Sequence, residues 1–270
     1  MVRYAFNHLD SIAEVLRQSP FGLITDVDGT ISPTAPTPQQ ARVSPLCHRY
    51  LALLCPQIAL VAAISGRPAA QVKEMVNIGG MVYIGNHGLE RWVNGHPELT
   101  KGTHNYLAVV KSAIGELSPL LSIEGIIIEN KGITATIHYR RCPDPKLAEE
   151  HVLAAVQNSP QARKLLVMPG RMAINLLPPV TVNKGTATLS LIQEYNLRRG
   201  IYLGDDVTDI DAFRVIRASY PELDFQGLAI AVTSEETPET LTEDADFTLK
   251  GVSDVERFLE WLCQTAAQLA

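Results

Sequence analysis

Two carboxylates set two residues apart are the feature of this sequence most suited to chemistry. Asp26 and Asp28 lie in the segment Asp26-Val27-Asp28-Gly29-Thr30, directly after a short apolar run. Side chains at positions i and i+2 of an extended chain point the same way, so the two carboxylates repel unless a cation or a proton separates them. Such a pair suits phosphoryl transfer, because one carboxylate can attack phosphorus while the other moves protons. Asp and Gly also favour turns, so an ordinary turn is the alternative interpretation.

A second acidic cluster favours the catalytic interpretation. Asp205, Asp206 and Asp209 follow another apolar run, 201–203. Acidic groups that meet at one edge of a sheet repel each other without a metal, and Mg²⁺ prefers oxygen ligands and offsets such charge. The alternative for Asp209 is capping of a helix, which is compatible with a role at a metal.

Smaller polar groups near these clusters could contact a phosphate. Lys184 could supply a fixed positive charge beside the attacking carboxylate, although a lysine near a helix start is often solvated. Ser65 could donate to phosphate, but Ser-Gly is also ordinary turn chemistry. Gly29 and Thr30 would allow backbone N–H groups to approach phosphate oxygens.

The elements around these residues predict an α/β fold. Several runs are apolar almost throughout: 21–25, 58–64, 201–203 and 228–232. The segments expected to be helical are 8–18, 39–54, one from Pro68 onward, and 252–268. Apolar strands that alternate with helices indicate a doubly wound, mostly parallel, Rossmann-like sheet covered on both faces. Ligands of such sheets lie beyond the carboxyl ends of the strands, so the polar clusters are expected at one edge.

The middle of the chain has a different pattern. From 104 to 178 the expected order is helix, strand, strand, helix, strand, strand: 105–118, 122–129, 132–139, 146–158, 165–168 and 172–177. A hairpin is predicted through Asn130–Gly132. We therefore expect an inserted α+β unit over 104–178 that acts as a lid, between the core segments 1–103 and 179–270.

Composition narrows the function classes. The chain has 270 residues and a net charge of −6, which argues against nucleic acid as a partner. Its four cysteines include no C-x-x-C, so zinc is not expected; disulfides stay possible, but a reduced compartment is the simpler interpretation. Eighteen apolar residues never run together, so no membrane partner is expected. We expect a cytoplasmic monomer or small homo-oligomer that acts on a small molecule.

Four segments together resemble, in order, the four motifs of the haloacid dehalogenase superfamily of phosphatases. They are Asp26 to Thr30, Ser65, Lys184, and Gly204 to Asp209. The resemblance spans nearly the whole chain, and it implies that Asp26 is the nucleophile and Asp28 the acid/base. It also implies a phosphate site and a Mg²⁺ site: Gly29, Thr30, Ser65, Gly66 and Lys184 for phosphate, and Asp26, the Asp28 carbonyl, Asp205 and Asp209 for metal, with Asp206 close by.

Further segments look like the trehalose-6-phosphate phosphatase branch of that superfamily. They include 64–67, 85–90, 129–132, 138–140 and 204–213. The resemblance implies a set of substrate-binding residues: Arg67, His87, Glu129, Lys131, Arg140, Arg171 and Asn175. Asn175 departs from the branch, which usually has Glu there, and an amide accepts through one oxygen where a carboxylate accepts through two. Glu129 and Lys131 could instead be an exposed ion pair beside a turn.

The function implied is Mg²⁺-dependent hydrolysis of trehalose 6-phosphate. Asn175 favours the nearest alternative, a phosphatase for another glycosyl phosphate such as a sucrose, glucosylglycerol or glycosyl-glycerate phosphate. A phosphomutase shares the fold and the aspartyl-phosphate. An inactive sugar-phosphate sensor is the alternative from another class, but it would not need an intact nucleophile and acid/base pair.

Overall fold

The computed structural model describes residues 3–35, 37–170, 172–218, 220–235, 237 and 239–269. Within this described part, the chain divides into two compact units, one of Met1–Glu98 with Val182–Ala270 and one of Leu99–Thr181. The segment 104–178, which the sequence sets apart as an insertion, lies within the second unit.

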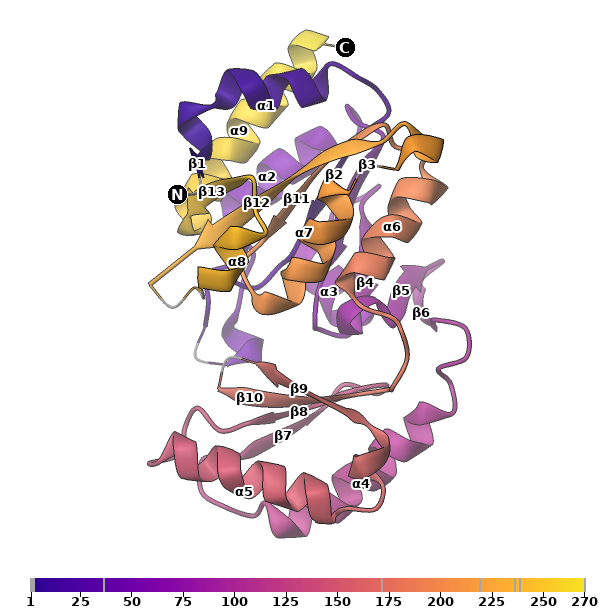
Figure 1. Ribbon diagram of the computed structural model, residues 1–270, viewed down its shortest axis with the longest axis vertical. Coiled ribbons are helices and arrows are strands. Elements are labelled where there is room, and N and C mark those ends of the chain that lie inside the picture. Colours follow the sequence, from indigo (N-terminus) through magenta and orange to yellow (C-terminus); the bar gives the residue numbers. More distant parts are fainter. Residues whose placement is uncertain are drawn as a thin grey trace. The chain divides into compact units, whose positions relative to one another are not determined.

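The larger sheet is mostly parallel, as predicted (Figure 1). Among the described residues it has nine strands, in the order β1-β13-β12-β11-β2-β3-β4-β5-β6. Their bounds are β1 Arg3–Tyr4, β13 Phe247–Lys250, β12 Gln226–Thr233, β11 Arg199–Gly204, β2 Phe21–Thr25, β3 Leu60–Ile64, β4 Val82–Gly85, β5 Glu90–Val93 and β6 His96–Leu99. In this spatial order, each strand from β1 through β13, β12, β11, β2 and β3 to β4 is parallel to the next one. The following strand, β5, pairs antiparallel with β4.

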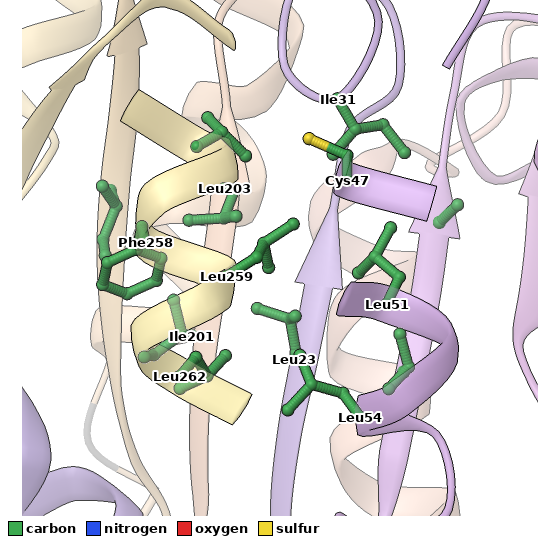
Figure 2. Packing of buried hydrophobic residues seen from close by; sticks show 14 of the residues in the cluster. Leu23, Ile31, Cys47, Leu51, Leu54, Ile201, Leu203, Phe258, Leu259 and Leu262 are labelled. Atoms are coloured by element: carbon green, nitrogen blue, oxygen red, sulfur yellow. The ribbon is translucent and has the colours of Figure 1, made fainter. Parts of the chain in front are cut away.

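Helices cover both faces of this sheet, so its central strands bury side chains on both sides. Alternate residues of one strand enter opposite cores: Leu23 of β2 packs into one and Ile24 into the other. Figure 2 shows Leu23 and Leu203 packed between two helices. The helices of this unit are α1 Leu9–Leu16, α2 Pro45–Leu54, α3 Ala69–Val76, α6 Lys184–Glu194, α7 Ile210–Arg217, α8 Glu239–Glu243 and α9 Gly251–Leu269. Burial on both faces explains why these strands are apolar at every position.

The predicted helix 39–54 is wrong in its first part. A short 3-10 helix, Pro38–Gln40, is followed by non-helical residues, and α2 begins only at Pro45. The Ser44 side chain accepts hydrogen bonds from the backbone N–H groups of Leu46 and Cys47, and a proline suits the first helical position. The remaining 3-10 helices are η1 Ala5–Asn7, η3 Asn86–Gly88, η4 Ala162–Lys164, η5 Val207–Asp209 and η6 Pro221–Leu223.

The second unit is an antiparallel sheet with two helices. Among its described residues the strand order is β7-β8-β10-β9. The elements are α4 Tyr106–Leu120, β7 Ile127–Asn130, β8 Ala135–His138, α5 Pro145–Asn158, β9 Leu166–Gly170 and β10 Ala173–Leu177. The hairpin of β7 and β8 is confirmed, with Gly132 N donating to Asn130 Oδ1 at 2.9 Å. The strand predicted over 122–129 begins later, after Gly125, whose φ is +89°.

None of the helices in the described part of the chain combines the length and apolar character needed to cross a bilayer. All four cysteines lie in that part, and each is a free thiol. Cys47, Cys142 and Cys263 are buried.

Candidate active site

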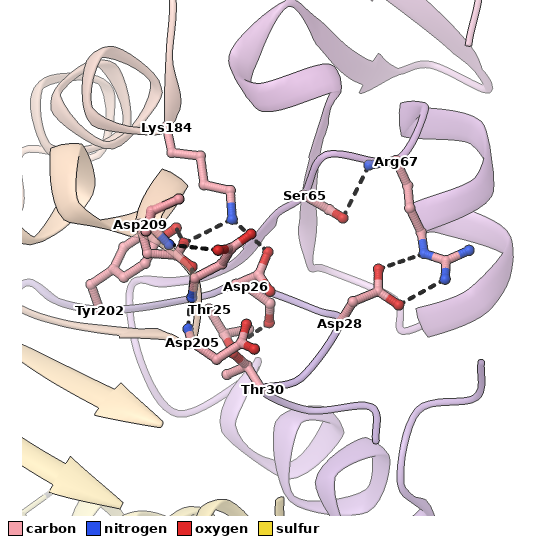
Figure 3. Close-up of polar contacts among 12 residues, drawn as sticks. Thr25, Asp26, Asp28, Thr30, Ser65, Arg67, Lys184, Tyr202, Asp205 and Asp209 are labelled. Atoms are coloured by element: carbon pink, nitrogen blue, oxygen red, sulfur yellow. Dashed lines mark hydrogen bonds and ion pairs between the residues drawn. The ribbon is translucent and has the colours of Figure 1, made fainter. Parts of the chain in front are cut away.

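The acidic residues meet where two neighbouring strands end (Figure 3). β2 ends at Thr25 and β11 at Gly204, and these parallel strands pair Leu203 with Thr25. Asp26 N donates to Leu203 O at 2.8 Å, which extends the ladder by one residue. Asp26 and Asp205, the first residues beyond the two strands, are therefore brought to the same edge of the sheet, as the sequence predicts.

Lys184 joins the two acidic segments. Its Nζ lies 2.7 Å from Asp26 Oδ1 and 2.8 Å from Asp209 Oδ1. Lys184 is the first residue of α6, which Asn183 caps, but it is only 2% exposed rather than solvated. The helix start thus directs a buried ammonium between two buried carboxylates.

Asp209 is held by donors from its own loop and from β11. Besides Lys184, the Tyr202 hydroxyl donates to Oδ1 at 2.7 Å. The backbone N–H groups of Asp205 and Asp206 donate to Oδ2 at 3.2 and 3.1 Å. Asp206 is the N-cap of this turn, and Asp209 at its third position completes a capping box by accepting from the Asp206 backbone, whereas, within the described residues, its side chain makes no cap hydrogen bond to α7. These donors fix the orientation of the carboxylate.

Two glycines make room for these carboxylates. A Cβ at Gly29, where φ is +86°, would lie 1.9 Å from Asp205 Oδ2. A Cβ at Gly204 would lie 2.4 Å from the carboxyl carbon of Asp209. Since real Cβ atoms do not approach other atoms this closely, both positions require glycine for the acids to pack against the backbone.

Among the described residues, Asp26, Asp205 and Asp209 form a cluster that could hold a metal ion. One ligand oxygen from each lies within 4.8 Å of the others, and all three residues are buried. Thr30 Oγ1 donates to Asp205 Oδ1 at 3.4 Å. Asp206 is not among the three residues of this cluster, and its Oδ1 accepts from Val207 N at 2.7 Å.

Burial and charge act against each other on these groups. Burial raises the pKa of Asp26 to about 7, although the Lys184 ammonium pulls it down. Burial alone would lower the pKa of Lys184, but Asp209 and Asp26 outweigh it, so the pKa is raised and the side chain stays charged. Burial and the nearby carboxylates raise the pKa of Tyr202 well above its usual value, so the hydroxyl remains a donor.

Asp28 and Arg67 form a bidentate ion pair beside this cluster. Arg67 Nε lies 2.6 Å from Asp28 Oδ2, and Nη2 lies 2.7 Å from Oδ1. Figure 3 shows the Asp28 carboxylate turned toward Arg67 rather than toward Lys184. Ser65 Oγ accepts from Arg67 N at 3.2 Å, and the His87 ring lies over Gly66.

The remaining expected residues belong to the second unit. Glu129 Oε2 lies 2.9 Å from His138 Nε2 and 3.7 Å from Lys131 Nζ. Within the sheet, the Asn175 Oδ1 accepts a hydrogen bond from Thr136 Oγ1. Arg140 is exposed after β8, and Arg171 lies outside the described residues.

Sequence reasoning missed Tyr202, Thr136 and His138 as polar partners of the expected site residues. Tyr202 lies in an apolar strand, where the sequence pattern indicates a core residue. Thr136 and His138 are two residues apart on β8, so both lie on the face of the sheet that carries Glu129 and Asn175. The alternation of polar and apolar residues along β8 was the available signal.

The sequence matches the model of a known protein family. The family model described as trehalose-phosphatase matches residues 24–253. The chain belongs to the trehalose-phosphatase family. The resemblance inferred from the sequence is therefore confirmed, and the phosphatase class is confirmed at the level of the family.

Curated relatives agree with this assignment. The chain is 29% identical to probable trehalose-phosphate phosphatase D of Arabidopsis thaliana, over 96% of this chain and 72% of that protein. It is 35% identical to trehalose-phosphate phosphatase of Mycobacterium tuberculosis, over 71% of this chain and 50% of that protein. The match thus covers only half the length of the mycobacterial relative.

Solved structures confirm the fold. The C-terminal domain of trehalose-6-phosphate phosphatase from C. albicans superposes with a TM-score of 0.76 at 22% identity, covering 98% of each chain. A trehalose-6-phosphate phosphatase related protein superposes with a TM-score of 0.73 at 22% identity, over 92% of this chain and all of that one.

Proposed function

We propose that this chain hydrolyses trehalose 6-phosphate to trehalose and inorganic phosphate, with Asp26 as the nucleophile. The observation that carries the proposal is the buried Asp26–Lys184–Asp209 arrangement at the ends of β2 and β11, in a member of the trehalose-phosphatase family. The printed names of the Arabidopsis and mycobacterial relatives support the substrate.

The chemistry assigns the two carboxylates of the Asp-x-Asp segment to different steps. The Asp26 carboxylate attacks phosphorus and forms an aspartyl-phosphate, while the bond from phosphorus to the sugar oxygen breaks and Asp28 protonates that oxygen. Asp28 then takes a proton from the water that attacks the aspartyl-phosphate, which releases phosphate and restores Asp26. Lys184 holds Asp26 in place, and the Ser65 hydroxyl, Gly66 and the backbone of Gly29 and Thr30 bind phosphate oxygens.

The acidic cluster fits a hard divalent cation. Three buried carboxylates with one ammonium among them are unfavourable without further positive charge, and oxygen donors are what Mg²⁺ prefers. We assign the Mg²⁺ site to Asp26, the Asp28 carbonyl and Asp205, with Asp209 in support. When bound, Mg²⁺ would offset the charge of the transferring phosphoryl group.

The second unit supplies the substrate-specificity cap in this proposal. Residues 104–178 would hold the disaccharide through Glu129, Lys131, Arg140, Arg171 and Asn175. The support is a row of polar side chains across its sheet: Glu129, Thr136 and Asn175 lie opposite one another on β7, β8 and β10.

Asn175 favours a second candidate, a phosphatase for another glycosyl phosphate. Thr136 Oγ1 donates to Asn175 Oδ1 at 2.7 Å, and Asn175 Nδ2 donates to Met168 O at 3.4 Å. An amide held between two strands in this way offers a sugar fewer hydrogen-bond acceptors than a free carboxylate would. Sucrose, glucosylglycerol and glycosyl-glycerate phosphates are the substrates to compare.

Phosphate release from a panel of these sugar phosphates tests the proposal, with and without Mg²⁺. We expect a strong preference for trehalose 6-phosphate, loss of activity in EDTA and its return with Mg²⁺. Asp26→Asn should abolish turnover, whereas Asp224→Asn, at an exposed surface ion pair with Arg198, should not. Preference for another glycosyl phosphate would overturn the substrate, and near-normal activity of Asp26→Asn would overturn the mechanism.

A further inference from the structure

We propose that Arg67 is a positioning residue that fixes the orientation of the Asp28 carboxylate, rather than a residue that binds the sugar. The inference rests on the function proposed above, because it assigns Arg67 a part in the proton transfers of Asp28. It starts from the bidentate contact, in which two guanidinium nitrogens each meet one oxygen of Asp28.

The geometry leaves Asp28 usable while it is held. Each carboxylate oxygen has two acceptor positions, so a guanidinium that occupies one on each oxygen leaves the other open. The Asp28 side chain is 39% exposed, whereas the Arg67 side chain is 12% exposed. The arrangement is therefore an accessible carboxylate held by a planar guanidinium that is largely covered.

A brace from the next strand holds the backbone of Arg67. The brace is the segment 85–90, between β4 and β5. Asn86 N donates to Arg67 O at 2.7 Å, and His87 N donates to Ser65 O at 2.9 Å. The Glu90 carboxylate accepts from Ala69 N at 2.9 Å and so caps the start of α3.

The conformation of the brace is unusual and tightly packed. Asn86, His87 and Gly88 all have positive φ, at 48°, 59° and 109°. A Cβ on Gly66 would lie 2.7 Å from the His87 ring, and one on Gly85 would lie 2.2 Å from Ala69 N. Positive φ is uncommon for residues other than glycine, although Asn and His adopt it more readily than most. We infer that this packing serves to hold the loop that carries Arg67.

A bidentate support restricts an aspartate more than a point charge does. An isolated aspartate has several side-chain rotamers, and an acid/base group must lie within hydrogen-bond reach of the proton that it transfers. Arg67 selects one orientation of Asp28 through its planar fork, which a lysine cannot reproduce. The effect of Arg67 on turnover should therefore depend on the presence of the Asp28 carboxylate.

A double-mutant cycle with phenyl phosphate tests this dependence, because that substrate has no sugar to bind. We expect Arg67→Met to lower kcat/KM by about tenfold with Asp28 present, and by less than about twofold in an Asp28→Asn background. Arg67→Lys should recover only part of the loss. Arg91→Met is the matched control, because Arg91 makes a bidentate pair with Glu194 on the same unit, and it should change kcat/KM little.

Each other outcome overturns the proposal. Equal losses in both backgrounds would show that Arg67 acts on the substrate directly, and a loss seen only with trehalose 6-phosphate would return it to sugar binding. No loss of kcat/KM in either background would show that the pairing of Arg67 with Asp28 has no effect on turnover. If Arg67→Met does not melt cooperatively, Arg67→Lys carries the cycle. Failure of the proposed function is distinct, because it appears in the unmutated enzyme, which would prefer another glycosyl phosphate or release no phosphate from any substrate, whereas the cycle compares variants on phenyl phosphate.

Discussion

Replacing Lys184 by methionine would leave Asp26 and Asp209 buried without the ammonium that bridges them. The side chains of these three residues are 3%, 6% and 0% exposed, so water cannot take the place of the ammonium. Removing one partner of a buried ion pair costs about 3–5 kcal/mol, because an uncompensated charge remains. For a unit of this size each kcal/mol lowers Tm by about 2–4 °C, so we expect a loss of about 6–20 °C.

Urea unfolding in EDTA measures this cost. Both tryptophans, Trp92 and Trp261, belong to the first unit, so their fluorescence reports its unfolding. The matched control is Lys250→Met, which makes the same change at an exposed lysine. A free energy of unfolding within about 1 kcal/mol of that control would refute the argument that the ammonium stabilises the buried carboxylates.

The cost should also depend on pH in a defined direction. The pKa of Asp26 is near 3.8 in an unfolded chain and about 7 in the folded metal-free protein. The folded state thus binds the proton more tightly, and the stability that this gives declines as pH rises from about 4 to about 7. Removing Lys184 removes the charge that lowers this pKa, so the penalty should be larger at pH 8 than at pH 5.5. A stability penalty that is larger at pH 5.5 than at pH 8 would contradict this expected direction.

Three other predictions address the site and the thiols. Asp28→Asn should lower kcat by about 10²–10⁴-fold in steady-state assays, the usual reach of general acid–base catalysis; a smaller loss would argue against its acid/base role. Glu129→Ala should lower kcat/KM for trehalose 6-phosphate far more than for phenyl phosphate, and equal losses would make Glu129 structural. Burial raises the pKa of Cys47 to about 12, so its alkylation, followed by mass spectrometry, should be slow at pH 7 and faster at pH 9. Rapid labelling at pH 7 would show that Cys47 is accessible.

The central strands could be predicted because burial on both faces leaves a direct trace in the sequence. The runs 21–25 and 201–203 are apolar at nearly every position, and β2 and β11 lie there. The order of acidic residues after these runs then locates the edge where they meet. By contrast, β6 has polar, exposed residues and no apolar run, so its sequence gives no strand signal.

The contacts made by the site residues could not be predicted in the same way. Lys184 opens a helix, where lysines are usually solvated, but it is only 2% exposed and contacts Asp26 after β2 and Asp209 after β11. Arg67 and Asp28 are 39 residues apart, and nothing in either motif indicates that they pair. The sequence pattern shows which face or strand end a residue occupies, but pairing across the sheet depends on how the strands are ordered.

The charge of the cluster connects its stability to its chemistry. Among the described residues, the cluster has three buried carboxylates and one buried ammonium, which contacts two of them, so two negative charges remain when all are ionised. A proton on Asp26 relieves one of these charges, and the raised pKa of Asp26 expresses that tendency in the metal-free protein. A divalent cation would neutralise both, and it would keep Asp26 ionised, the form that attacks phosphorus. Proton and cation should therefore compete for the same site, so the cation binds less tightly as pH falls below about 7.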